Sequence, residues 1–293
     1  MSFNFEQKYS EYLEEFNVYL DSVLSSLDKN APSLIVDAMR YAVEGGGKRV
    51  RPILCIATAD VLGLSFDDVK EFALAIELIH SYSLVHDDLP AMDNDDYRRG
   101  KLSTHKKFGE AYGILAGDAL LNFAFELCLS KQNMTQNHID ACRVIAEYAG
   151  YKGMIAGQVL DLLNEKNPNA NEDVLYSIFE NKTSKLLTAP LLAASLTANG
   201  KYYDTLKEFG LNLGVLFQIT DDIMDEEGTL ASIGKTPHKD KEVDKLTSVK
   251  LFGLDGAKKL AKERYTKCIE LLSKVSGSDF LLAFTDKMFT RKS

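Results

Sequence analysis

Two clusters of aspartates, each at the end of a long apolar stretch, constrain this chain more than any other feature. The first cluster spans residues 86–93 and reads His-Asp-Asp-Leu-Pro-Ala-Met-Asp; the second spans residues 217–225 and reads Phe-Gln-Ile-Thr-Asp-Asp-Ile-Met-Asp. Each close pair of carboxylates repels by about 4 kcal/mol in partly shielded surroundings. A compensating cation is therefore expected, and divalent metals that prefer oxygen ligands are the obvious candidates. Two such clusters indicate metals that hold one polyanion between them.

The spacing of the aspartates supports this interpretation. At 100° per residue, Asp221, Asp222 and Asp225 share one face of a helix. In the first cluster Pro90 interrupts helical regularity, so Asp93 is expected where the helix ends. Mg²⁺ commonly takes one or two carboxylates together with phosphate oxygens, rather than a full protein cage. Acid clusters on facing helices fit this coordination preference of Mg²⁺.

Two plainer explanations compete for these aspartates. A solvated acidic helix end explains a lone Asp-Asp pair, and it stays open for either cluster taken alone. A calcium-binding loop is excluded, because its sixth and twelfth positions require glycine and glutamate and here hold Arg98 and Thr104.

Basic residues stand in islands against a net charge of −9. Segment 45–52 reads Gly-Gly-Gly-Lys-Arg-Val-Arg-Pro, and the further islands are Arg98-Arg99, Lys182-Thr183 and Gly234-Lys235-Thr236. A Walker phosphate loop is excluded, because Ala42 stands where glycine is required and Arg49 replaces the Ser or Thr. Segment 45–52 alone is also typical of a loop between two helices. Together, the islands indicate a polyphosphate ligand, since arginine binds phosphate bidentately and lysine supplies a mobile charge.

In this combination and order, the motifs resemble those of one family. They are Gly46 to Pro52, Asp87 to Asp93 with Arg98 and Arg99, Gly157-Gln158 with Asp161, Lys182-Thr183, and Asp221 to Asp225 with Gly234-Lys235. The chain resembles the trans-isoprenyl diphosphate synthases from about Tyr9 to the C-terminus, and among them most closely the bacterial farnesyl diphosphate synthases.

Composition and pattern predict an all-α fold. The chain has 293 residues, of which 45% are apolar, so it can bury a large core, and no composition shift marks a domain boundary. Apolar residues recur at helical spacing over 9–27, 66–86, 111–129, 174–196, 206–224 and 251–272. We expect one prenyltransferase domain, 1–293, as a bundle of about ten core helices; the resemblance implies a deep central cavity within it. Ser65 with Asp68 predicts a helix start, and 164–171 and 226–244 are expected loops.

Several classes of protein are disfavoured by the sequence. Four widely spaced cysteines suggest neither a zinc site nor a disulfide framework, and they favour buried thiols in a cytoplasmic protein. The acidic N-terminus does not read as a signal peptide, and no apolar run is long enough to predict stable membrane insertion. The acidic balance argues against nucleic acid as a partner.

The resemblance implies a Mg²⁺-dependent transferase that joins isopentenyl diphosphate to an allylic diphosphate, dimethylallyl or geranyl. The implied metal ligands are Asp87, Asp93 and Asp221, supported directly or through water by Asp88, Asp222 and Asp225. Three Mg²⁺ ions per active site are expected, with Mn²⁺ as a substitute. The cations implied for the leaving diphosphate are Arg98, Lys182 and Lys235. Those implied for isopentenyl diphosphate are Lys48, Arg51, His80 and Arg99.

The roles of several other polar residues are less specific. The Gln218 amide and the Thr183 hydroxyl are implied to direct dipoles toward the allylic cation. A single histidine on an apolar helix is usually a core residue, but His80 lies two turns before Asp87 on nearly the same face. Gln158 and Asp161 are expected either to line the cavity or to form interhelical hydrogen bonds.

Chain length and assembly are also implied by the resemblance. An aromatic residue five positions before the first motif closes the product pocket in the family, which makes Tyr82, with Ser83, the expected stop. The fifteen-carbon product, farnesyl diphosphate, is therefore expected, and the geranylgeranyl product is the alternative. Tyr82 as an ordinary core residue also stays open. A homodimer is the expected assembly.

The loop after the second cluster departs from the family pattern. Gly234, Lys235 and Asp240 fit it, but His238 replaces a glycine and Ser248 replaces an aromatic residue. Two other functions remain as rivals. A class I terpene cyclase needs no second diphosphate site and usually has Asn, Ser or Thr with Glu in its second motif. A non-catalytic synthase subunit usually lacks one acid cluster.

Overall fold

The computed structural model describes residues 3–27, 31–165, 167–227 and 245–291. Within these ranges the all-α prediction is confirmed, and strands are limited to the antiparallel pair β1 (Tyr97–Arg98) and β2 (Lys101–Leu102). The described helices are α1 (Phe5–Ser25), α2 (Ser33–Glu44), α3 (Val50–Leu62), α4 (Phe66–Asp87), α5 (Thr104–Phe108), α6 (Glu110–Cys128), α7 (Gln136–Ala149), α8 (Met154–Asn164), α9 (Glu172–Ile178), the π-helix η1 (Phe179–Ser184), α10 (Lys185–Thr197), α11 (Tyr203–Glu227), α14 (Ser248–Leu272) and α15 (Asp279–Thr290).

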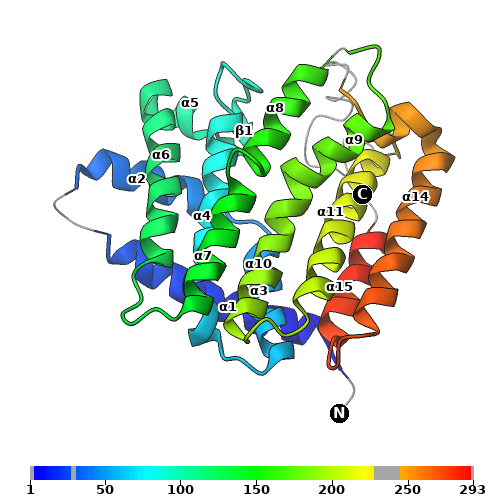
Figure 1. Cartoon of the computed structure of the whole chain (residues 1–293). Helices are drawn as coiled ribbons and strands as arrows, with labels where there is room; N and C mark the ends of the chain where they lie inside the picture. The colour runs from blue at the N-terminus through cyan, green and yellow to red at the C-terminus, as the bar shows by residue number, and fades with distance from the viewer. Residues whose placement is uncertain (1–2, 28–30, 166, 228–244, 292–293) are drawn as a thin grey trace.

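Three helices, α3, α4 and α10, form the centre of the bundle. They are apolar around most of their circumference, as buried helices are, and they bury most of their side chains. α3 packs against α4 and α10, α4 also packs against α6, and α10 against α7 and α11. Figure 1 shows α6 and α7 on one side of this centre and α11, α14 and α15 on the other.

Helix α4 starts where the sequence predicts. The backbone N–H of Ser65 donates to Asp68 Oδ2 at 2.9 Å, and the Ser65 hydroxyl donates to the same oxygen at 2.7 Å. The helix then runs for 22 residues, which corresponds to about 33 Å at 1.5 Å per residue. It therefore carries Asp87 to the opposite end of the bundle from Ser65, where α11 also ends (Figure 1).

Two element predictions need correction. The helical pattern over 174–196 is not one α-helix, because η1 separates α9 from α10. Such π-helical turns occur frequently at functional sites. Of the predicted loop 164–171, Asn164 is the last residue of α8, and the described residues 165 and 167–171 lie between α8 and α9. Helix α11 extends two residues into the predicted loop 226–244. Lys235 and His238 lie outside the described residues.

Helix α6 is the one described helix that is long and apolar enough, by length and composition, to cross a membrane. A core helix of a globular protein passes the same test. Here α6 packs against α2, α4 and α5 as part of the bundle.

Candidate active site

The first aspartate motif is a helix end followed by a tight return of the chain. α4 ends at Asp87, and the backbone N–H of Asp93 donates to the Asp87 carbonyl at 2.8 Å. The N–H of Asp95 donates to the Asp88 carbonyl at 3.1 Å. These bonds fold the segment that contains Pro90 back over the helix end. Asp93 therefore lies beside the end of the helix, as predicted.

Asp88 is buried against Arg98 from β1. Arg98 Nε donates to both carboxylate oxygens of Asp88, at 3.0 and 3.2 Å, and the Asp88 side chain is only 3% exposed. Burial raises the pKa of Asp88, and Arg98 opposes that rise. In this geometry the Asp88 carboxylate positions Arg98; its expected support of a metal, directly or through water, stays a prediction.

Asp87 is contacted from a different helix. Gln158 Nε2 on α8 donates to Asp87 Oδ1 at 2.9 Å. Burial raises the pKa of Asp87 to about 6; Lys182 opposes the rise and Asp93 adds to it. Of the two roles considered for Gln158, the structure shows the interhelical hydrogen bond.

The second motif lies on the last turns of α11. Asp222 Oδ2 accepts hydrogen bonds from the backbone N–H and the hydroxyl of Ser248, both at 2.7 Å, and so ties α11 to the start of α14. Ser248 is the residue that replaces the family's aromatic. Asp221 pairs with Arg291, whose guanidinium also donates to Thr220 Oγ1 at 2.8 Å.

The π-helix η1 presents two of the expected polar groups. Lys182 Nζ donates to Asp161 Oδ2 on α8 at 2.5 Å. Thr183 Oγ1 donates to Gln218 Oε1 on α11 at 2.8 Å. The Thr183–Gln218 bond fixes the two dipoles assigned to the allylic cation relative to each other. Through these two hydrogen bonds η1 contacts α8 at Asp161 and α11 at Gln218.

The glycine-rich loop before α3 meets the first motif through Arg99. The Arg99 guanidinium donates to the Gly46 carbonyl and lies against Gly47, where a Cβ would lie 2.7 Å from its Cζ. Gly47 also has a φ of +122°, which side chains rarely adopt, so glycine is favoured at this position. The Lys48 carbonyl accepts a hydrogen bond from the Tyr9 hydroxyl, which holds the loop to α1.

Arg51 and His80 lie together with these cations. Arg51 Nε is buried and has no hydrogen-bond partner among the described residues. Burial lowers the pKa of Arg51 to about 10. Burial, followed by the charges of Arg51 and Arg99, lowers the pKa of His80 well below its usual value. A buried guanidinium nitrogen without a protein partner is a candidate donor to a bound anion.

Sequence reasoning missed two arginines. Arg49 forms a buried pair with Glu77 at 2.7 Å, with side chains 5% and 3% exposed, and anchors the loop instead of facing a ligand. Arg291 reaches the second motif from the end of α15. Glu77, inside the otherwise apolar stretch 72–79 of α4, was the available signal for the first pair; no sequence pattern indicated the second.

Tyr82 and Ser83 lie below the first motif on α4. The Tyr82 ring packs edge-on against His86 at 5.7 Å, and His86 Nε2 lies 3.0 Å from the Ile114 carbonyl of α6. The Tyr82 hydroxyl is buried without a partner among the described residues, and Ser83 Oγ donates to the His80 carbonyl at 2.9 Å. Tyr82 is therefore buried beside His86, the residue that contacts α6, and its role in closing the product pocket stays a prediction.

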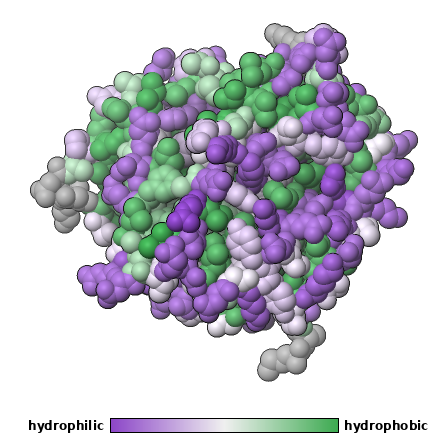
Figure 2. Space-filling model, in the orientation of Figure 1, coloured by the Kyte–Doolittle hydropathy of each residue, from purple (hydrophilic) through white to green (hydrophobic). Residues whose placement is uncertain are grey.

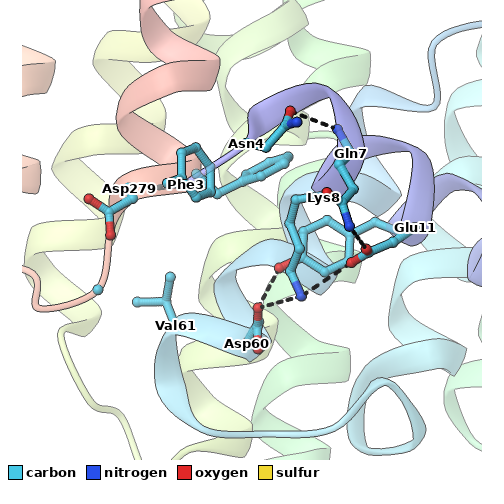
Figure 3. Close-up of a pocket in the computed structure, with 11 residues that line it drawn as sticks. Phe3, Asn4, Gln7, Lys8, Glu11, Asp60, Val61 and Asp279 are labelled. Atoms are coloured by element: carbon cyan, nitrogen blue, oxygen red, sulfur yellow. Dashed lines mark hydrogen bonds and ion pairs between the residues drawn. The ribbon is translucent and has the colours of Figure 1, made fainter. Parts of the chain in front are cut away.

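A cavity of about 390 Å³ lies far from both motifs, between α1, the end of α3 and the start of α15 (Figure 3). Asp60 lines one side of this cavity, and its Oδ2 lies 3.3 Å from Lys8 Nζ and 2.5 Å from the Tyr12 hydroxyl. A second cavity of about 40 Å³ lies behind the first motif, between Tyr41 and Arg99. Neither lies between the two aspartate motifs, so the deep central cavity stays a prediction.

The site residues fit Mg²⁺. Within the described part of the chain, no three carboxylate, imidazole or thiol groups converge as a ready-made metal cage. Mg²⁺ does not need one, because it completes its coordination with phosphate oxygens and water. The donors are carboxylates, and the Arg291 guanidinium on Asp221 shows that this carboxylate accepts a cation.

Paired aspartate motifs at one end of an all-helical bundle, beside a cluster of arginines, define a class of polyphosphate-binding helical proteins. Within that class, the chain belongs to the polyprenyl synthetase family, whose sequence profile matches residues 32–278. It is similar to farnesyl diphosphate synthase of Micrococcus luteus, with 41% identity over 91% of this chain and 92% of that protein. It is also similar to chloroplastic geranylgeranyl pyrophosphate synthase of Capsicum annuum, with 40% identity over 89% and 71% of the two chains. The structure of geranyltransferase from Helicobacter pylori, complexed with magnesium and isoprenyl diphosphate, superposes with a TM-score of 0.82 at 32% identity, covering 99% of this chain and 97% of that one.

Proposed function

We propose that the protein is a short-chain trans-prenyltransferase that condenses isopentenyl diphosphate with dimethylallyl and geranyl diphosphates to form farnesyl diphosphate. One observation carries this proposal: Arg99 follows the first aspartate motif and packs on the Gly46-Gly47 loop. It thereby joins a metal-type acid site to a cationic site that contains Arg51 and His80. An acidic site for a metal-bound diphosphate next to a cationic site for a second diphosphate suits a condensation of two substrates. A terpene cyclase needs only the acidic site.

The allylic diphosphate belongs at the acid site. Asp87, Asp93 and Asp221 would hold Mg²⁺, which supplies Lewis-acid charge to the leaving diphosphate when bound. Asp88, Asp222 and Asp225 would support this site directly or through water, and Asp88 also holds Arg98. We expect three ions, with Mn²⁺ as a substitute.

The chain's own cations neutralise the leaving group. Lys182 and Arg98 lie close enough to Asp87 to oppose the rise of its pKa. Both charges therefore act on the space beside Asp87, where the leaving diphosphate would bind. Lys235 is assigned the same role, although it lies outside the described residues. Preorganised charge of this kind stabilises a developing anion without reorganisation during the reaction.

The second substrate belongs at the cationic site. Lys48, Arg51, His80 and Arg99 would bind isopentenyl diphosphate, with its double bond directed toward the allylic carbon. Thr183 and Gln218 orient their dipoles toward the cation that forms. The released diphosphate then accepts the proton whose loss creates the new double bond.

We propose a homodimer built on two apolar stripes. α6 exposes Tyr112, Ile114 and Leu115, which are 41%, 47% and 52% exposed, and α8 exposes Val159 and Leu163, which are 50% and 70% exposed. Hydrophobic surface is visible on this part of the molecule in Figure 2. Contiguous exposed apolar surface is typical of an interface, and a twofold axis pairs such a surface with its own copy. Light scattering at micromolar concentration distinguishes the dimer from a monomer.

We also propose a single domain and a cytoplasmic location, in keeping with the four buried thiols. The activity is tested by incubating the purified protein with Mg²⁺, isopentenyl diphosphate and each allylic primer, and then sizing the products. A fifteen-carbon product supports the proposal, and a twenty-carbon product favours geranylgeranyl synthesis. A hydrocarbon formed without isopentenyl diphosphate would indicate a cyclase, and no product would indicate a non-catalytic subunit.

A further inference from the structure

Helix α8 carries Gly157, Gln158 and Asp161, and all three contact active-site groups on other elements. A Cβ at Gly157 would lie 2.1 Å from the backbone nitrogen of Lys182 and 2.4 Å from its Cα. No side chain fits there, so the α8 backbone lies directly against η1 at Lys182. This close approach fixes the distance between α8 and the lysine.

Asp161 binds two lysines with one oxygen. Its Oδ2 accepts from Lys182 Nζ at 2.5 Å and lies 3.7 Å from Lys245 Nζ, and its side chain is only 8% exposed. Burial by itself would raise the pKa of Asp161, but the charges of Lys245 and Lys182 hold it below its usual value. The carboxylate is therefore an anion that gathers two ammonium groups, one from η1 and one from the residues before α14.

The arrangement leaves Lys182 able to bind a further anion. An ammonium has three donors, and the bond to Asp161 uses one donor of Lys182. The three groups together carry a net charge of +1. Lys182 also lies near Asp87, and its charge opposes the rise that burial causes in the pKa of Asp87. Asp87 is in turn bonded to Gln158, three residues before Asp161 on α8.

We propose that Asp161 is a positioning residue that holds Lys182 and Lys245 as a pair facing the leaving diphosphate. This inference rests on the proposed function, which places Lys182 at that diphosphate. A free lysine side chain loses considerable rotamer entropy when it is fixed on a ligand. Asp161 fixes it beforehand, and the same helix holds Asp87 through Gln158. A single helix thus aligns the metal-site carboxylate with the cations that receive the leaving group.

A purely structural salt bridge is the competing explanation, and a substrate-specific readout separates the two. Asp161→Asn keeps an oxygen acceptor but removes the charge that gathers the lysines. We expect kcat to fall by about 30-fold and KM for the allylic diphosphate to rise by about 5-fold, with KM for isopentenyl diphosphate unchanged. Asp161→Glu restores the charge and should recover most of kcat. Asp173→Asn, an exposed aspartate in the first turn of α9, is the matched control.

Two measurements make the test decisive. Calorimetric binding of inorganic diphosphate with Mg²⁺ should weaken by about 10-fold in Asp161→Asn, because the cations that receive it are no longer held in place. In a Lys182→Ala background, adding Asp161→Asn should lower kcat by less than about 3-fold. The effects of two residues that act through each other are not additive. Full additivity, or diphosphate binding equal to that of the wild type, would overturn the proposal. A wild-type protein that fails to extend any allylic diphosphate would instead refute the proposed function, so the two failures are distinguishable.

Discussion

Arg291 and Asp221, 70 residues apart in the chain, form an ion pair at the second aspartate motif. The same guanidinium donates to the Phe217 carbonyl at 2.9 Å and lies 4.4 Å from the centre of the Phe217 ring. A side chain from the C-terminal end of the described chain therefore places positive charge on a carboxylate assigned to Mg²⁺. We therefore expect metal and arginine to compete for that carboxylate.

Arg291→Ala should therefore bind Mg²⁺ more tightly than the wild type. We expect about 5-fold, corresponding to about 1 kcal/mol, which is typical of a partly exposed ion pair. The same substitution should lower the Tm of the metal-free protein, since the pair is lost. Isothermal titration with Mg²⁺ measures the first effect, with Lys274→Ala on the exposed surface as the control. Equal Mg²⁺ affinity in the two variants would contradict competition.

Asp87→Ala and Asp221→Ala should each lower kcat/KM by about 10³-fold or more, because a lost metal ligand removes charge stabilisation made mainly in the transition state. The fold should persist, since neither side chain is part of the apolar core. Turnover and circular dichroism are measured side by side, with Asp173→Ala as the control. Near-normal turnover in both variants would refute the metal assignment.

Arg51→Ala and Lys182→Ala should separate the two diphosphate sites. The Arg51 substitution should raise KM for isopentenyl diphosphate by about 10-fold or more, because a charged hydrogen-bond partner is removed from that site. The Lys182 substitution should raise KM for the allylic substrate and also lower kcat. Steady-state kinetics with each substrate varied in turn measures both effects. Equal losses for both substrates in both variants would show that the division is wrong.

His80 should make stability depend on pH. Its pKa in the folded protein is below the unfolded value, since burial and neighbouring arginines disfavour the imidazolium. The unfolded chain then binds a proton that the folded chain does not, so the stabilisation is complete above about pH 6.5 and is lost as the pH falls. The slope contributed by this one group is about 1.4 kcal/mol per pH unit. Denaturant unfolding between pH 5 and 7 should show a weaker slope in His80→Asn, and identical slopes would contradict the prediction.

Tyr82→Ala should lengthen the product. The resemblance assigns the Tyr82 ring to the floor of the product pocket, so its removal should deepen the pocket and give products of twenty carbons or more. Tyr82→Phe keeps the ring and should leave the product at fifteen carbons, which controls for loss of the hydroxyl. Product sizing after equal turnover measures the change. Fifteen-carbon products from the alanine variant, at unchanged activity, would remove Tyr82 from this role.

Local sequence patterns identified most helices and the candidate ligands. The Ser65–Asp68 cap and the position of Asp93 after Pro90 follow from hydrogen bonds and backbone restrictions within a few residues. η1 was missed because a π-turn inserts one residue without changing the apolar character of its neighbours. Its position depends on the close packing of α8 at Gly157, which is a contact between helices.

Partnerships between distant residues were not available from the sequence. The motifs identified Asp88, Asp222 and Lys182 as polar site residues, but not that Arg98, Ser248 and Asp161 bind them.

By itself, the sequence determined the helical class, the two acid motifs and the basic islands, because periodicity and residue chemistry are local properties. Only the tertiary structure decided which carboxylate binds which cation. Such pairing depends on distances of a few ångströms between helices, and these are set by side-chain packing across the whole core. Two arginines from neighbouring motifs illustrate the difference. Arg49 forms a buried pair with Glu77 and stabilises the fold, whereas the exposed Arg99 contacts the glycine loop at the candidate site. Packing between helices, and not the local sequence, separates the two roles.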